Sequence, residues 1–288
     1  MPVKKNIPFR TTVLNLTANV FLFILKFLVG IWSNSIAILS DSFNSLTDVM
    51  ASMAIYISVK IQHKKADKEH PFGHHRAEPI AGLIVAIISG ILAFEVLRES
   101  YLRLNQEPYH IRGILPISAL LISIFTKLAM SIHFKRVGER IKSPAILATA
   151  VDSRNDVLST LVALIGVGGA ALGYGMFDGI SGIIISFFIF WAGYKIGKEN
   201  IDYLMGRAAP HELMQEVKKR AISVKGVKNL NDVRSHFVGN FIHIEIHIEV
   251  DGKLSTESSH SIGTQVKNKI LELDSISEVF VHIDPAFD

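Results

Sequence analysis

The sequence of 288 residues contains no cysteine. Disulfide bonds and thiolate ligands are therefore excluded, and a metal ion could be held only by oxygen or imidazole groups. The sequence also has no nucleophile–base set and no phosphate-binding glycine loop, so we expect neither enzymatic activity nor a prosthetic group. We expect no cleavable signal peptide, because the first apolar stretch is long enough to span a membrane and lacks a convincing cleavage site.

Charge is sparse, since charged residues make up 19% of the chain and hydrophobic residues 49%. The mean hydropathy of +0.34 is too high for an ordinary soluble domain and too low for a chain lying wholly in lipid. This balance predicts a membrane domain joined to a soluble one. The net charge of +4 is modest, and the basic residues lie in loops beside apolar segments. That placement indicates membrane topology and argues against nucleic-acid binding.

Six apolar segments can be drawn, at about 12–33, 36–61, 79–103, 112–134, 145–171 and 177–200. Each can cross about 30 Å of hydrocarbon as a helix that rises about 1.5 Å per residue. Alternate connections are basic: Lys4, Lys5 and Arg10, then Lys64, Lys65, Lys68 and Arg76, then Lys135, Arg136, Arg140 and Lys142. The other connections carry only Arg103 and Arg112. The positive-inside rule predicts a multi-pass protein of the cell membrane, plasma or inner, with both termini in the cytoplasm.

The chain changes character after about Arg207, which predicts a domain boundary between residues 206 and 207. We expect a helix at 211–224, strands at 229–236 and 241–250, a helix at 256–273 and a strand at 277–284. The second strand alternates isoleucine and valine with histidine and glutamate, so one of its faces is apolar. This αββαβ order predicts a small α+β domain of the ferredoxin-like kind, with its helices on the apolar face of the sheet.

Two pairs of oxygen-bearing side chains lie inside apolar segments. Asp152 and Asp156 are four residues apart, and so are Asn44 and Asp48. Positions four apart share one face of a helix, and ionisable residues are costly inside a membrane. Two such helices could close a cage of four oxygen ligands around a divalent cation. The alternative is that these side chains only hydrogen-bond the helices to each other.

The chemistry of this ligand set is one amide and three carboxylates. Hard oxygen ligands suit Mn²⁺, Fe²⁺, Mg²⁺ or Ca²⁺, whereas Zn²⁺ usually recruits histidine or cysteine. Crowded carboxylates in an empty, low-dielectric site tend to hold protons, so metal and protons are expected to exchange. We interpret Asp41, two turns before Asp48, as an access-path or packing residue. Lys26 and Lys127 could snorkel or pair with acids, and neither gives a strong functional signal.

Two further groups of ligand-type residues lie outside the apolar segments. Asp67, His70 and His74 are close together in one basic loop and could converge on a cation. The second group is predicted in the soluble domain and consists of His247, His260, His282 and Asp284. It could bind metal where two subunits meet. The alternatives are a solvated loop near anionic headgroups and an ordinary wet face of a sheet.

These residues give the sequence a resemblance to the cation diffusion facilitator family over nearly its whole length. Residues 40–48, 152–156 and 70–74 resemble the family's second-helix, fifth-helix and loop motifs. The resemblance implies a homodimeric metal/proton antiporter that exports divalent transition metal from the cytoplasm by alternating access. It assigns residues 1–206 to a six-helix transmembrane transport domain and 207–288 to a cytoplasmic, metal-responsive dimerisation domain. Asn44 and Asp152 stand at the two variable positions, as in the manganese-handling branch, with Fe²⁺, Zn²⁺ and Co²⁺ as alternative substrates.

Two positions depart from the pattern of relatives. Zinc-binding relatives commonly have a histidine where this chain has Asn231, so a full binuclear site is not implied. Some relatives pair a basic residue after the loop motif, here Arg76, with an acid at the position of Gly206, so that interlock is not implied either. The rival function is a membrane-tethered metal sensor. A passive channel fits poorly, because a multi-carboxylate cage holds divalent ions too tightly for fast conduction.

Overall fold

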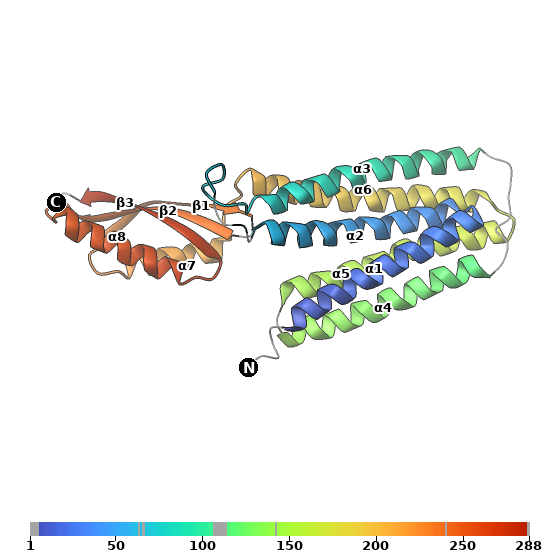
Figure 1. The fold of residues 1–288 in the computed structure, drawn as a ribbon, viewed down its shortest axis with the longest axis horizontal. Helices are drawn as coiled ribbons and strands as arrows, with labels where there is room; N and C mark the ends of the chain where they lie inside the picture. The colour runs from blue at the N-terminus through green and yellow to red at the C-terminus, as the bar shows by residue number, and fades with distance from the viewer. Residues whose placement is uncertain are drawn as a thin grey trace. The chain divides into compact units, whose positions relative to one another are not determined.

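A computed structural model describes residues 6–62, 64, 67–105, 114–141, 143–239 and 241–286. Lys4, Lys5, Lys65, Arg112 and Lys142, which entered the prediction of topology, lie outside the described residues. The helices of the first two-thirds of the chain are α1 (Asn6–Ser33), α2 (Ile36–Gln62), α3 (Ala77–Leu104), α4 (Leu115–Ile141), α5 (Pro144–Ala171) and α6 (Met176–Leu204), drawn in Figure 1. The chain divides into two compact units, Met1–Ile55 with Ile84–Gly197, and Tyr56–Leu83 with Lys198–Asp288.

The first unit is a bundle of long helices around one shared core. All six helices contribute buried side chains to this core, among them Val29 of α1, Ile38 of α2 and Val167 of α5. α4 packs against both α5 and α1. Small residues allow close approach between helices: a Cβ atom added to Gly166 of α5 would lie 2.6 Å from the Ser181 Oγ of α6. Close packing between helices therefore contributes to holding the bundle together.

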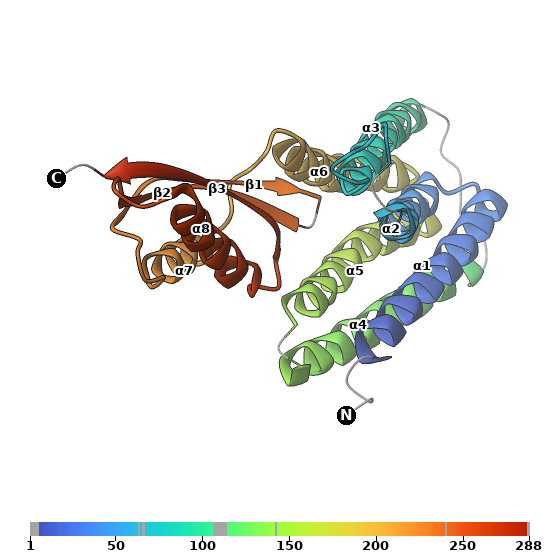
Figure 2. The same ribbon diagram turned by 60° about the vertical axis from the view of Figure 1, so that its left-hand side comes forward.

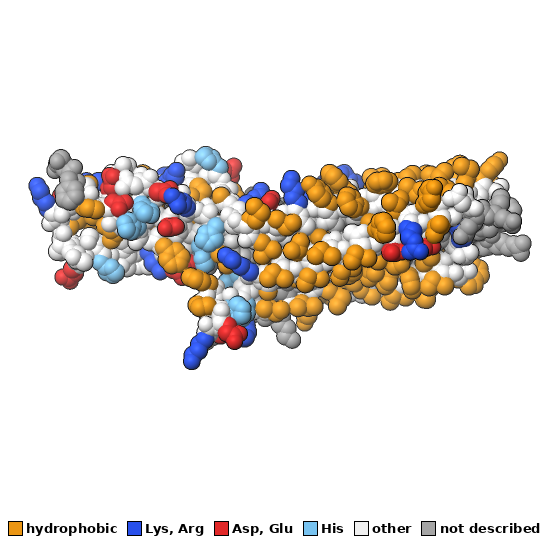
Figure 3. Space-filling model, turned by 90° about the horizontal axis from the view of Figure 1, so that it is seen from above, with side chains coloured by type: hydrophobic (Ala, Val, Ile, Leu, Met, Phe, Trp, Pro, Cys, Tyr) orange, Lys and Arg blue, Asp and Glu red, His pale blue; other side chains and the backbone are white. Residues whose placement is uncertain are grey.

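The outer surface of this bundle is apolar, as Figure 3 shows for one face. Among the described residues, four stretches are long and apolar enough to cross a membrane: Thr11–Ser33, Ala77–Leu104, Leu115–Ile141 and Met176–Leu204. They correspond to α1, α3, α4 and α6. The two other long helices, α2 and α5, carry the polar motifs, which lower their mean hydropathy. The structure therefore supports a helical membrane domain with four apolar spans, and six spans remain a prediction.

The second unit contains a three-stranded sheet with two helices on one face (Figure 2). Its elements are α7 (His211–Ile222), β1 (Asn229–Val238), β2 (Phe241–Asp251), α8 (Thr256–Leu271) and β3 (Ile276–Ala286). β2 is the central strand, antiparallel to β1 and parallel to β3. A parallel pair needs a long crossover, and α8 supplies it. The observed order of elements is the one expected from the sequence.

Period-two alternation along β2 determines which face is buried. Ile244, Ile246 and Ile248 are fully buried against Val217 of α7 and Val266 of α8. The histidine and glutamate side chains between the isoleucines are on the opposite face. Because the helices occupy the isoleucine face, the polar face of the sheet is free to carry ligand-type residues.

Replacing Ile246 by alanine is expected to destabilise this unit by about 2–5 kcal/mol, because a fully buried side chain leaves a cavity when it is truncated. Ile222, at the end of α7, is 55% exposed, so the same truncation there is expected to change the free energy of unfolding little. Pulse proteolysis of the purified full-length variants in urea would measure both changes. Equal effects of the two truncations would contradict the assigned core.

Candidate metal-binding sites

Three of the four predicted membrane ligands meet between α2, α4 and α5. Asn44 Nδ2 donates a hydrogen bond to Asp156 Oδ1 at 3.2 Å, which joins α2 to α5. Lys127 of α4 contacts both carboxylates: its Nζ lies 3.3 Å from Asp48 Oδ2 and also binds Asp156 Oδ2. The structure thus gathers one amide and two carboxylates around an ammonium group.

Asp152, the fourth predicted ligand, lies one helical turn before Asp156 on α5 and is exposed. It forms no hydrogen bond or ion pair with any residue in the described part of the chain. Its charge does interact with those of Asp156, Lys195 and Lys127. Asp152 is therefore beside the cluster without being tied into it, which leaves its carboxylate available to an incoming cation.

Lys127 pairs with acids, which was one of the two expectations from the sequence, but its contact with two of the predicted ligands was not foreseen. Its side chain is only 2% exposed, so the ammonium group is withdrawn from solvent. The sequence could have indicated this contact, because Lys127 is the only charged residue between Leu115 and Met130, within an apolar segment. Such a residue is expected to face the interior of the bundle and to have a partner.

Asp41 forms a second buried ion pair on α2. Lys26 Nζ donates to Asp41 Oδ2 at 2.9 Å and to the Asp41 carbonyl oxygen at 3.0 Å. Ser159 Oγ and Thr160 Oγ1 each donate to the Asp41 carboxylate at 2.9 Å. Asp41 has no exposed surface, so its carboxylate is fully engaged by protein groups. These contacts support the packing role among the two interpretations offered for this residue.

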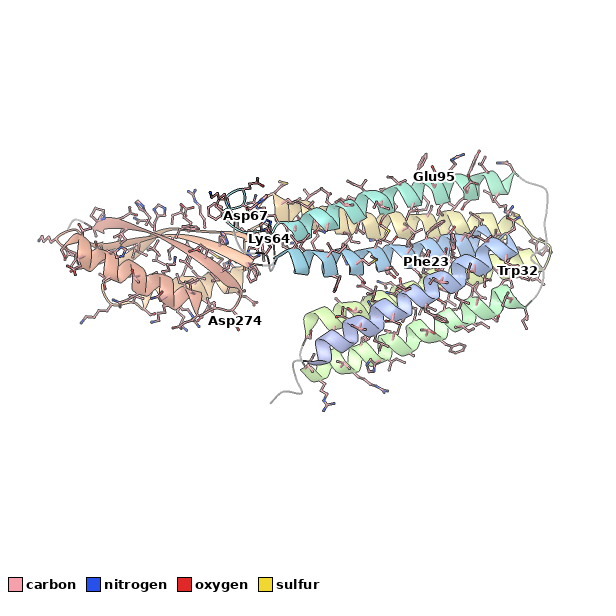
Figure 4. All side chains as sticks on the ribbon, viewed as in Figure 1. Phe23, Trp32, Lys64, Asp67, Glu95 and Asp274 are labelled. Atoms are coloured by element: carbon pink, nitrogen blue, oxygen red, sulfur yellow. The ribbon has the colours of Figure 1, made fainter. Side chains whose placement is uncertain are left out.

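The loop between α2 and α3 brings together Asp67, His70 and His74, whose potential ligand atoms all lie within 4.8 Å of one another. Figure 4 labels Asp67 and its neighbour Lys64. Asp67 Oδ1 accepts hydrogen bonds from the backbone N–H groups of His70 at 2.8 Å and Glu69 at 3.1 Å. The His70 hydrogen bond, followed by the one from Lys64, holds the pKa of Asp67 well below its usual range. The carboxylate is therefore ionised, and its position is fixed, at physiological pH.

This loop packs on the sheet within the second unit. The His75 ring lies 4.8 Å from that of Phe241, between centroids, and Phe72 lies 6.4 Å from His243. A cavity of about 640 Å³ lies between loop and strands. Burial, and then the neighbouring His236, lowers the pKa of His243, so this imidazole stays neutral at physiological pH. The loop and the sheet are thus in direct contact within the second unit.

The polar face of the sheet brings together His247, His282 and Asp284, again with potential ligand atoms within 4.8 Å. His247 and His282 are register partners on the parallel strands β2 and β3, and Asp284 follows two residues later on the same face. The distance from His282 Nε2 to Asp284 Oδ1 is 3.2 Å. Asn231 Nδ2 donates to Asp284 Oδ2 at 3.0 Å, and this hydrogen bond, with the two histidines, lowers the pKa of Asp284. Such a set of two imidazoles and a carboxylate can hold a transition metal.

His260 does not join this group within one chain, and its part in a site where two subunits meet stays a prediction. It lies on α8, and α8 covers the isoleucine face of the sheet. His247 and His282 are on the other face, so the sheet separates them from His260. The sequence predicted the helices on the apolar face, which the structure confirms, and that placement puts His260 on the side of the sheet opposite His247 and His282.

Comparisons with known proteins match both parts of the chain. Residues 12–205 match the family model described as cation efflux transmembrane domain, and residues 209–286 match cation efflux protein, cytoplasmic domain. An uncharacterized transporter of Methanocaldococcus jannaschii is 32% identical over 273 residues, which is 94% of this chain and 96% of that protein. The manganese efflux system protein MneP of Bacillus subtilis is 28% identical over 296 residues, covering 99% of this chain and 98% of MneP.

The cation-efflux pump FieF of Klebsiella pneumoniae is 28% identical over 92% of this chain and 88% of its own length. Among solved structures, a cadmium form of a MamM CTD variant is 23% identical. That match covers 27% of this chain and 98% of the MamM fragment, with a TM-score of 0.26.

Replacing His282 by alanine is expected to weaken metal binding at the sheet by roughly tenfold or more, because one of three ligands is lost. The measurement is Zn²⁺ titration of the purified full-length protein, in a His70→Ala background that disables the loop group. His260→Ala is the matched control, since it removes an imidazole on the other side of the sheet. Equal affinities for the two variants would contradict the assignment.

Proposed function

The chain belongs to the cation efflux family, and from that premise we propose that it is a proton-coupled antiporter that exports Mn²⁺ from the cytoplasm by alternating access. Proteins of this family are transporters and not enzymes. The observation that carries the proposal is the meeting of Asn44, Asp48 and Asp156 between α2 and α5, with Asp152 one turn away. Oxygen ligands from two membrane helices are what a site for a hard divalent cation requires.

The proposed architecture has six membrane spans in residues 1–206 and a ferredoxin-like cytoplasmic domain in residues 207–288. All six long helices share one buried core, which supports counting α2 and α5 as spans. The matching family description calls the C-terminal region cytoplasmic, which supports a cell-membrane protein with both termini inside. The cytoplasmic domain would form a homodimer.

Manganese is the proposed substrate because the membrane ligand set contains oxygen and neither imidazole nor thiolate. MneP and MneS of Bacillus subtilis, two relatives of this chain, are named as manganese efflux system proteins. Fe²⁺, Zn²⁺ and Co²⁺ are the alternatives within the same mechanism. The loop and sheet groups, which contain histidine, would bind metal for regulation and not for passage.

In the proposed cycle, cytoplasmic Mn²⁺ enters an inward-open site and displaces protons from Asp48, Asp152 and Asp156, while Asn44 completes the ligand set. The helices then rock to expose the site outward, where the higher proton activity favours release of the metal. Metal captured by His247, His282 and Asp284 would draw the cytoplasmic domains together and favour the transport-competent dimer. The family match supports transport of a divalent metal, and the residues named here are the ones proposed to bind it.

Asp152→Ala is expected to abolish proton-coupled Mn²⁺ flux into vesicles, because the site loses a charged ligand that no other residue replaces. The variant should still fold and dimerise, since Asp152 is exposed and forms no ion pair or hydrogen bond with the described residues. Glu95→Ala is the matched control: Glu95, labelled in Figure 4, is an exposed acid of α3, and it pairs with Arg98. Undiminished flux in Asp152→Ala would exclude the proposed transport site.

The same flux assay separates the rival functions when it is run on the wild-type protein with and without a pH gradient. A membrane-tethered metal sensor would move no metal under either condition. A passive channel would conduct metal without regard to the pH gradient. Only an antiporter would accumulate Mn²⁺ against its gradient when protons flow the other way.

Asp152→His is expected to shift selectivity from Mn²⁺ toward Zn²⁺, because an imidazole nitrogen replaces a carboxylate in the ligand set. Competition between the two ions for transport in vesicles would measure the ratio. The conservative variant Asp152→Glu keeps an oxygen ligand and is expected to retain the preference for Mn²⁺. An unchanged ratio in Asp152→His would mean that this position does not contact the substrate.

A further inference from the structure

Lys127 occupies the place where the proposed substrate would bind. Its ammonium group contacts Asp48 Oδ2 at 3.3 Å and also contacts Asp156 Oδ2. The residue is 1% exposed and comes from α4, a helix that contributes none of the four predicted ligands. The contact therefore joins a third helix to the two that carry the motif.

An ammonium group and a metal ion cannot use the same carboxylate oxygens at one time. A hard dication binds carboxylate oxygens at about 2.0–2.2 Å, a distance that leaves no room for a second cation on the same lone pairs. A lysine in this position must therefore move away when metal arrives. Its four-carbon stem is flexible enough for such a movement.

We propose that Lys127 is the internal counter-cation of the transport site, and that the divalent substrate binds by displacing its ammonium group from Asp48 and Asp156. This inference rests on the proposed transport function. In the metal-free site, protons neutralise part of the carboxyl groups, and Lys127 neutralises the carboxylate among Asp48 and Asp156 that has released its proton and would otherwise be buried without a partner. In the loaded state its displaced charge opposes the metal, so it limits affinity and assists release.

The ion pair between Lys26 and Asp41 gives an internal comparison. Both pairs involve acids of α2 and a nearly fully buried lysine, but Asp41 also accepts hydrogen bonds from Ser159 and Thr160 and has no exposed surface. The side chain of Asp48, in contrast, is 33% exposed, so an ion can reach it. The Lys26 pair is thus closed and structural, whereas the Lys127 pair is accessible and can exchange.

The test compares Mn²⁺ affinity among full-length variants purified in detergent, in a background carrying His70→Ala and His282→Ala to disable the other two groups. Lys127→Met is expected to bind Mn²⁺ roughly tenfold tighter or more, because a competing unit charge at contact distance is removed. Lys127→Arg is expected to bind roughly tenfold more weakly, because a guanidinium can hold both carboxylates through several donors. Lys26→Met is the matched control and should leave Mn²⁺ affinity unchanged.

The opposite directions of the two Lys127 variants distinguish displacement from a merely structural role, which would weaken binding in both. Affinity in Lys127→Met equal to or weaker than wild type would overturn the inference. If Lys127→Met does not fold, Lys127→Arg decides, because it retains the charge; binding as tight as in wild type would then overturn it. In vesicles, tighter binding in Lys127→Met should appear as a lower KM together with a lower maximal rate.

Asp156→Asn in the same background separates this inference from the proposed function. Loss of Mn²⁺ binding in Asp156→Asn, with no difference among the Lys127 variants, would refute the role of Lys127 alone. Wild-type binding in Asp156→Asn would place the metal elsewhere and refute the proposed transport site, and the inference with it.

Discussion

The membrane part of this protein depends on one constraint, which is that a carboxylate inside an apolar helix bundle must be neutralised. Two lysines satisfy it along α2: Lys26 for Asp41 and Lys127 for Asp48. Both lysines come from neighbouring helices, so each ion pair also fixes how the helices are rotated about their axes. Charge neutralisation and helix packing therefore depend on the same contacts. Replacing any of the four side chains, Lys26, Asp41, Asp48 or Lys127, affects both.

In the second unit, the alternation of apolar and polar residues along β2 determines which side chains are buried. The isoleucine face of β2 has to meet α7 and α8, and this forces the histidines onto the uncovered face. The crossover through α8 makes β3 parallel to β2 and aligns His247 with His282. The potential metal site on the sheet is thus a consequence of strand register, and a shift of one residue would turn His247 into the core.

Local patterns in the sequence were sufficient for much of this structure. The spacing of four residues placed Asn44 with Asp48 on one face of α2, and period two placed the isoleucines of β2 in the core. Hydropathy was a weaker guide for α2 and α5, since the polar motifs lower their mean hydropathy. What no local pattern could supply was tertiary, namely which carboxylates Lys127 of α4 would contact. The sequence predicted that Lys127 could pair with acids, but it did not identify Asp48 and Asp156 as the partners.

A transporter must bind its substrate in one state and give it up in another, and a site made only of carboxylates is poorly suited to the second step. Three acids without an internal cation would hold a dication tightly and would be unstable when empty. An ammonium group that returns to Asp48 and Asp156 as the metal leaves weakens the binding of the dication and stabilises the empty site, since the site is never without a cation. The neutral amide of Asn44 also limits the negative charge of the site, because a fourth carboxylate in its place would require a further positive charge. In the proposed transport cycle, the balance between Lys127 and the substrate would make the site bistable, which is the property that alternating access requires.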